Sequence, residues 1–114
     1  MGSKETILDV RCHDQGGSEY IVEMQVLKQD YFDRRVLYYA SKAYHTQLGK
    51  GENYHELKPV IFVGILNFEF TENSHWISTH RIYDVDTKEH VLTDFDFTFV
   101  ELPKFIKTES ELES

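Results

Sequence analysis

The chain has 114 residues and a mass of 13.5 kDa, which is enough for one cored domain and too little for two. Its 12 basic and 20 acidic side chains give a net charge of −8, which argues against nonspecific coating of nucleic acid. Aromatic residues make up 14% of the chain, and so many rings exclude a disordered acidic tail. A single cysteine excludes an intramolecular disulfide framework and favours a cytoplasmic location, and no apolar run is long enough to predict a membrane span.

A β-hairpin is predicted at the start of the chain. Residues 6–14 alternate apolar and polar side chains, and residues 19–27 are rich in β-branched and apolar ones. Between them, Gln15-Gly16-Gly17-Ser18 supplies the positive φ angles of a tight turn. Cys12 alternates to the face opposite Asp9 and is expected to be a small core residue.

A helix follows the hairpin and leads to a central strand. The helix is predicted over about residues 31–48, with Asp30 as its N-cap and glycines beyond its end. Residues 60–66 form a continuous β-branched run, which is typical of a strand covered on both faces. Gly64 has no side chain within that run, so we expect another group to pack closely against it.

The last third of the chain returns to strand patterning. Residues 79–85 and 91–92 are predicted to be extended, around a turn at 86–88. Phe95, Phe97 and Phe99 alternate with polar residues as in a half-buried strand, and Pro103 is expected to limit that strand.

The predicted architecture is of the α/β class, with an α+β mixed sheet and a helix that crosses over between the hairpin and the central strand. We expect one domain over residues 4–108 and a flexible acidic tail over residues 109–114.

Three polar residues of the hairpin attract attention as a candidate site. Glu23 and Gln25 are two apart on one strand, so they point to the same face. A three-residue turn at 15–17 would place Asp9 directly opposite Glu23, with their Cβ atoms about 5 Å apart. A two-residue Gly-Gly turn would instead place them on opposite faces. The turn sequence permits both registers.

Two carboxylates beside apolar residues repel each other unless a cation neutralises them. A hard divalent ion such as Mg²⁺ takes oxygen ligands and keeps room for water and phosphate. Such an ion polarises a phosphodiester and activates water, which is hydrolytic phosphoryl chemistry, and Gln25 would orient the water or a phosphate. The alternative interpretation is two solvated carboxylates on the outer face of a hairpin.

Residues 28–50 are locally basic, in contrast to the acidic remainder. Five basic and two acidic side chains give this segment a net charge of +3: Lys28, Arg34, Arg35, Lys42 and Lys50 against Asp30 and Asp33. Tyr38 and Tyr39 lie among them, which suits phosphate contact and base stacking. The alternative is a solvated helix face, on which Arg35 packs along a tyrosine ring.

An ordered set of residues extends from about Ile7 to Phe70 and continues at residues 100–105. It comprises Asp9, Glu23-Met24-Gln25, Phe32-x-x-Arg35, Tyr38-Tyr39, Ser41-Lys42, Gln47-Leu48, Gly51, Tyr54, Leu57 and Pro59-Val60-Ile61. In this order the set resembles the PD-(D/E)XK nuclease family transposases, also called recombination-promoting nucleases.

The resemblance implies a restriction-endonuclease-like fold and Mg²⁺-dependent DNA cleavage, with Mn²⁺ as an alternative ion. Asp9 would match the aspartate of the motif and Glu23 its second acidic residue, both as metal ligands. Gln25 would match the position that is lysine in the wider superfamily. We expect Arg35, Lys42 and Tyr39 to contact the DNA.

Two departures from the family pattern shape the expectations. Glutamine replaces lysine at position 25, as is usual in this branch of the superfamily. The chain also begins at what should be the second core strand, so the resemblance implies a missing first helix and strand. A missing strand would leave an unpaired sheet edge, through which we expect a homo-oligomer to form. The alternative function is a catalytically inactive interaction or DNA-binding module on a degenerate nuclease scaffold.

Overall fold

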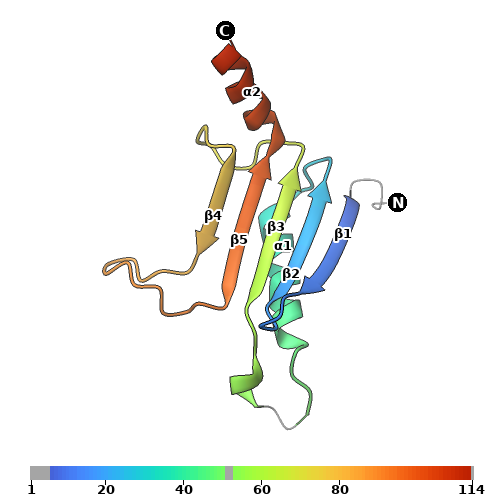
Figure 1. The fold of residues 1–114 in the computed structure, drawn as a ribbon, viewed down its shortest axis with the longest axis vertical. Helices are drawn as coiled ribbons and strands as arrows, with labels where there is room; N and C mark the ends of the chain where they lie inside the picture. The colour runs from blue at the N-terminus through green and yellow to red at the C-terminus, as the bar shows by residue number, and fades with distance from the viewer. Residues whose placement is uncertain (1–5, 51–52, 114) are drawn as a thin grey trace.

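The computed structural model describes residues 6–50 and 53–113 as a mixed five-stranded sheet with two α-helices and one short 3-10 helix (Figure 1). The strands are β1 (Thr6–His13), β2 (Glu19–Gln25), β3 (Val60–Leu66), β4 (Ile77–Arg81) and β5 (Phe95–Glu101). The helices are α1 (Phe32–His45), η2 (Tyr54–Glu56) and α2 (Leu102–Glu113). The predicted mixed α+β sheet is confirmed.

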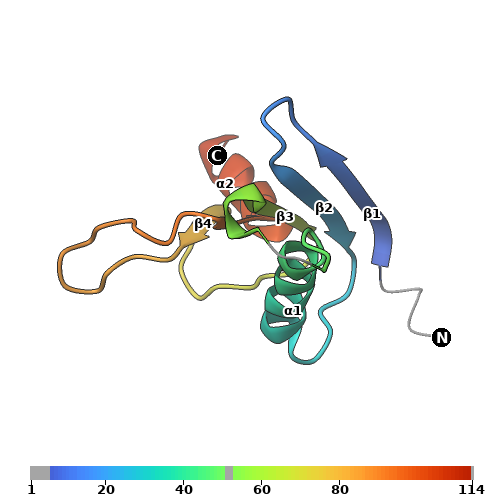
Figure 2. The ribbon, with the colours of Figure 1, turned by 90° about the horizontal axis from the view of Figure 1, so that it is seen from below.

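The sheet order is β1-β2-β3-β5-β4. The three inner strands are parallel to one another, and each edge strand is antiparallel to its neighbour. The crossover from β2 to β3 contains α1, which lies against one face of the sheet (Figure 2). None of the helices in the described part of the chain is long and apolar enough to cross a membrane.

The hairpin has a three-residue turn, which is the alternative that pairs Asp9 with Glu23. The backbone N–H of Asp14 donates to the carbonyl of Ser18 at 3.1 Å, which leaves residues 15–17 as the turn. Gly17 adopts φ 93°, a left-handed conformation that glycine adopts without steric cost. As a result, Asp9 is the direct partner of Glu23 across the β1–β2 ladder.

The helix α1 packs through a stripe of residues at helical spacing. Its buried members are Phe32, Val36, Ala40 and Ala43, which join Ile21, Val60, Phe62, Leu66 and Phe99 in the core. The helix is shorter than predicted, and Tyr31 replaces Asp30 as its N-cap, with φ 61° and no side-chain cap. This left-handed backbone turns the chain sharply into the helix, at a conformational cost of about 1–3 kcal/mol.

Gly64 lies on β3 between Glu23 on β2 and Phe99 on β5. The Phe99 ring fills the space above it, so that a Cβ atom at position 64 would lie 2.9 Å from Phe99 Cδ1. The expected close packing at this glycine is therefore confirmed. Phe99 is itself buried and contacts Phe62 and Phe70.

The segment between β4 and β5 differs from the prediction of extended structure over 79–85 and 91–92. β4 ends at Arg81, and residues 82–94 form an irregular loop that projects from the sheet (Figures 1 and 2). Its turn is held locally, because the Asp84 carboxylate accepts from the backbone N–H groups of Asp86 and Thr87. Without a neighbouring layer, Val85 remains 79% exposed.

The helix α2 extends to Glu113 and includes most of the acidic segment 109–114 that we expect to be a flexible tail; residue 114 lies outside the described residues. Pro103 is the second residue of α2, a position at which its missing N–H leaves no intrahelical bond unmade. Pro103 limits the strand as expected, since β5 ends at Glu101, and α2 begins directly after it. Cys12 also differs from expectation: it is exposed, since no helix covers its side of β1 in the described residues.

A buried ion pair ties the start of α2 to the body. Lys104 Nζ lies 2.8 Å from Glu101 Oε1, and the two side chains are 4% and 0% exposed. Glu101 also accepts hydrogen bonds from the backbone of Phe70 and Thr71. Although burial alone would raise the pKa of Glu101, these bonds hold it below its ordinary value.

We predict that Gly64→Ala lowers the free energy of unfolding by about 1–3 kcal/mol, because the added methyl group must displace the Phe99 ring. Urea denaturation measures the change. Gly49→Ala is the matched control: a Cβ there meets nothing within 4 Å, and we expect a change within about 0.5 kcal/mol. Equal stabilities for the two variants would contradict the close packing.

Candidate functional site

Three polar side chains of the hairpin leave the sheet on the face that α1 covers. Glu23 and Gln25 point to the same side as Ile21, a core residue. Asp9, as the direct cross-strand partner of Glu23, leaves the same face. Glu23 is 1% exposed and Gln25 is 0% exposed, whereas Asp9 is exposed on the edge strand. Of the two hairpin registers that the turn sequence permits, the structure has the one that places Asp9 opposite Glu23.

Arg35 on α1 binds both polar residues of β2. Its Nη1 donates to Glu23 Oε1 at 2.7 Å and to Gln25 Oε1 at 3.1 Å, and its Nη2 donates to Glu23 Oε2 at 3.3 Å. This two-pronged contact is the geometry in which a guanidinium binds a carboxylate most strongly. The Gln25 amide is held from its other end, because Nε2 donates to the carbonyl of Leu27 at 3.2 Å. The helix thus supplies the cation that neutralises the buried carboxylate.

The electrostatics of Glu23 reflect three influences. Burial raises its pKa above the ordinary 4.5, because the charged form loses its hydration. Arg35 opposes this increase through its charge and its hydrogen bonds, and the negative charge of Asp9 adds to the increase. The charge of Asp9 therefore acts on the protonation of Glu23 in the direction opposite to that of Arg35.

The three residues expected to contact DNA lie in one row along α1. Arg35, Tyr39 and Lys42 follow one another at spacings of four and three residues, which places them on one side of the helix. Lys42 is exposed, and the Arg35 Cζ atom lies 4.8 Å from the centroid of the Tyr39 ring. The structure therefore places all three side chains on one side of α1. Arg35, however, already binds Glu23 and packs against the Tyr39 ring.

The oxygen atoms of Asp9, Glu23 and Gln25 form the donor set that could hold a metal ion. Carboxylate and amide oxygens are hard ligands, and they suit Mg²⁺ or Mn²⁺ when water and phosphate complete the coordination. No group of three or more acidic, histidine or cysteine side chains that could share a metal occurs in residues 6–50 and 53–113. The three side chains therefore offer ligand atoms of the type that these ions bind, but only two of the three can carry a negative charge.

The contact between Arg35 and Glu23 is the feature that sequence reasoning missed. The available signal was the alternation of β2, because Ile21 is a core residue and Glu23 and Gln25 share its face. A carboxylate on that face needs a cation, and Arg35 borders the buried stripe of the next helix.

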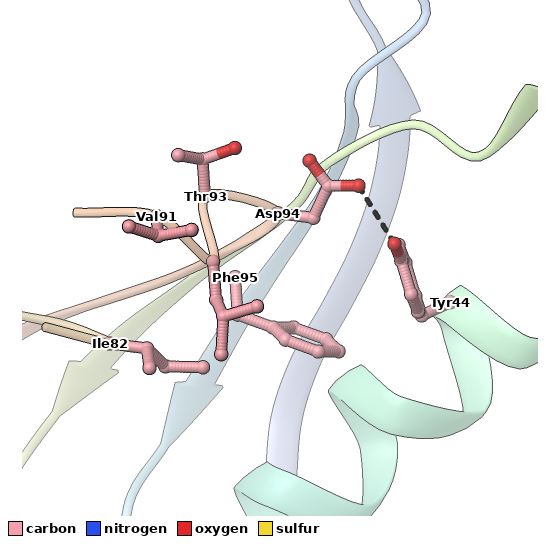
Figure 3. A pocket seen from close by; sticks show the side chains of 7 residues that line it. Tyr44, Ile82, Val91, Thr93, Asp94 and Phe95 are labelled. Atoms are coloured by element: carbon pink, nitrogen blue, oxygen red, sulfur yellow. Dashed lines mark hydrogen bonds between the residues drawn. The ribbon is translucent and has the colours of Figure 1, made fainter. Parts of the chain in front are cut away.

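A separate pocket of about 380 Å³ lies at the other end of the sheet, near the end of α1 and the start of β5 (Figure 3). The hydroxyl of Tyr44 donates to Asp94 Oδ2 at 2.8 Å, and its ring packs 5.0 Å from that of Phe95. Apolar side chains, including Ile82 and Val91, form much of its remaining wall. The hydrogen bond from Tyr44 to Asp94 fastens the end of the 82–94 loop to α1.

Comparison with known families identifies a relationship that covers the chain. The family model described as PD-(D/E)XK nuclease family transposase matches residues 1–114, the whole chain. The mixed sheet with its crossover helix is consistent with the restriction-endonuclease-like fold of that family. No curated protein and no solved structure shows significant similarity to the chain.

We predict that Asp9→Asn lowers the pKa of Glu23, because it removes the negative charge that favours the protonated form. The pKa is measured by NMR titration of the Glu23 side-chain carboxyl carbon. Asp33→Asn serves as the control, since Asp33 is an exposed carboxylate in the first turn of α1. An unchanged or increased Glu23 pKa in Asp9→Asn would show that the two carboxylates are not coupled.

Proposed function

The chain belongs to the PD-(D/E)XK nuclease family transposases, and on this basis we propose that it is a divalent-metal-dependent DNA endonuclease of the recombination-associated type. The observation that carries the proposal is the direct cross-strand pairing of Asp9 with Glu23 on one face of the sheet. A family match alone gives ancestry, whereas two coupled carboxylates beside a buried amide supply the groups that phosphodiester hydrolysis needs.

In the proposed mechanism, Asp9 and Glu23 would hold Mg²⁺ or Mn²⁺ through their carboxylate oxygens. Such an ion would supply Lewis-acid chemistry, namely activation of water and neutralisation of charge on the scissile phosphate. Gln25 orients the attacking water or a phosphate oxygen through its amide, since a neutral amide donates and accepts hydrogen bonds. The apolar core beside Glu23 limits access of bulk water to this end of the donor set.

DNA is the proposed substrate, and the row along α1 is its proposed contact surface. Lys42 is exposed and would neutralise a backbone phosphate. Tyr39 offers a ring to the substrate, and Arg35 at the inner end of the row lies nearest the carboxylates. These roles agree with the local positive charge of residues 28–50 in an acidic protein.

A second candidate function is a catalytically inactive interaction or DNA-binding module on the same scaffold. The observation that favours it is the bidentate contact of Arg35, because its guanidinium supplies the positive charge that the buried Glu23 carboxylate needs. Cleavage that depends on Asp9 and Glu23 distinguishes the enzyme from this module.

We also propose a cytoplasmic location, in keeping with the free thiol of Cys12, and self-association through the edge strand β1. An exposed edge presents unpaired backbone groups that can pair with a second copy. We propose a single domain over residues 4–108, and this domain includes the β1 edge.

We predict that the full chain nicks or linearises supercoiled plasmid in Mg²⁺ or Mn²⁺ and that Glu23→Ala reduces the rate on the order of a hundredfold or more, as for loss of a catalytic group. Asp9→Asn should show a similar loss, and Asp33→Asn should retain the original rate. Gel electrophoresis of the plasmid forms gives the rates. Equal cleavage by the unaltered chain and Glu23→Ala would remove Glu23 from the mechanism.

We predict that the chain is dimeric or larger in sedimentation equilibrium at high protein concentration. Val10→Lys, which places a charge on β1 at a position that is 41% exposed, should shift the population toward monomer. Val85→Lys is the control, because Val85 belongs to the 82–94 loop, and that loop follows β4 at the opposite edge of the sheet (Figure 1). A monomer at every concentration would contradict assembly through the edge.

A further inference from the structure

Arg35 occupies the oxygen atoms that a divalent cation would need. Both carboxylate oxygens of Glu23 accept from its guanidinium, at 2.7 and 3.3 Å, and Gln25 Oε1 accepts at 3.1 Å. These oxygens belong to two of the three side chains in the proposed donor set. A guanidinium and a divalent ion compete for the same lone pairs, and their positive charges repel at ligand distances.

We propose that Arg35 is a built-in counter-cation of the carboxylate site and that a divalent metal binds by displacing it from Glu23. The inference rests on the proposed metal site and deepens it, because it assigns control of metal loading to a residue of the chain itself. Arg35 is a positioning residue in this scheme: it holds the buried carboxylate ready while the site lacks metal.

The surroundings of Arg35 permit such an exchange. Its side chain is 21% exposed, whereas Glu23 is 1% exposed, so the arginine has a path to solvent and the carboxylate does not. The Tyr39 ring, 4.8 Å from Cζ, supports the guanidinium from α1 after its bonds to Glu23 break. Asp9, exposed on β1, offers the incoming ion its first carboxylate.

Displacement would also couple metal loading to substrate binding. The fork of an arginine matches two phosphate oxygens as well as it matches a carboxylate. Arg35 heads the row that continues through Tyr39 to Lys42, so a released guanidinium lies where DNA is proposed to approach. The same side chain then serves Glu23 in the metal-free protein and a phosphate in the loaded complex.

The affinity of the full chain for Mn²⁺, measured by electron paramagnetic resonance of the free ion, tests the proposal. Arg35→Met removes the charge and keeps most of the side-chain length. We expect it to bind Mn²⁺ about tenfold more tightly or better than the unaltered chain, the scale of one charged hydrogen bond. Arg34→Met is the matched control, because Arg34 precedes it on the same helix, is exposed and contacts Tyr31. We expect its affinity to stay unchanged.

A second measurement uses the unaltered chain, because Arg35→Met leaves the Glu23 carboxylate buried without a cation. In NMR spectra of arginine side chains, saturating Mg²⁺ should shift the guanidinium signals of Arg35 and leave those of Arg34 in place. The carboxyl carbon of Glu23 reports metal binding in the same sample.

The outcomes separate this inference from the proposed function. Equal Mn²⁺ affinity with and without Arg35, an equal gain in Arg34→Met, or Mg²⁺ binding that leaves the Arg35 signals unmoved would overturn displacement and leave the metal site intact. Failure of the unaltered chain and of both variants to bind Mn²⁺ would overturn both.

Discussion

A carboxylate that water hardly reaches needs a cation, and this requirement joins the helix to the sheet. Glu23 is 1% exposed, and breaking a buried ion pair by removing one partner typically costs about 3–5 kcal/mol. Arg35 meets the requirement only because α1 crosses the sheet beside β2. Arg35 lies one helical turn after Tyr31, the residue with the left-handed backbone that precedes α1. The position of the helix and the charge state of the carboxylate therefore depend on each other. The side chain that we propose as a metal ligand is thus also one half of a structural ion pair.

The hairpin could be predicted, and its register narrowed to two alternatives, because the causes are local. A turn rich in glycine, the alternation of β2 and the spacing of Asp9 from Glu23 lie within one short segment, and Gly17 has the backbone conformation the turn requires. The ion-pair partner of Glu23 could not be predicted in this way. That partner, Arg35, lies 12 residues further along the chain, on a helix whose position against the sheet is not set by local sequence. Local rules misled in the 82–94 loop, whose strand-like residues pair with no other strand in the described part of the chain. Pro103 ends β5 as a local rule predicts, but that rule does not predict the helix that follows.

The basic segment of residues 28–50 divides in the folded protein. Its charge looked like one surface for nucleic acid, but Arg35 turns inward to the carboxylate while Arg34 and Lys42 remain exposed. The amino-acid composition could not predict this division, because it gives the number of charged side chains and not the direction in which each one points. It also explains how a protein of net charge −8 can place positive charge beside an acidic site: the cation and the carboxylates are on different elements that the crossover brings together.

The buried pair of Glu101 and Lys104 has a consequence for how the protein opens. One carboxylate holds the end of β5, the first turn of α2 and the backbone at Phe70 and Thr71. Segments that share a single buried anchor tend to unfold together rather than fray independently. The C-terminal helix, which extends beyond the end of the sheet in Figure 1, and the loop after β3 are therefore expected to open as one cooperative unit, with amide hydrogens that exchange together.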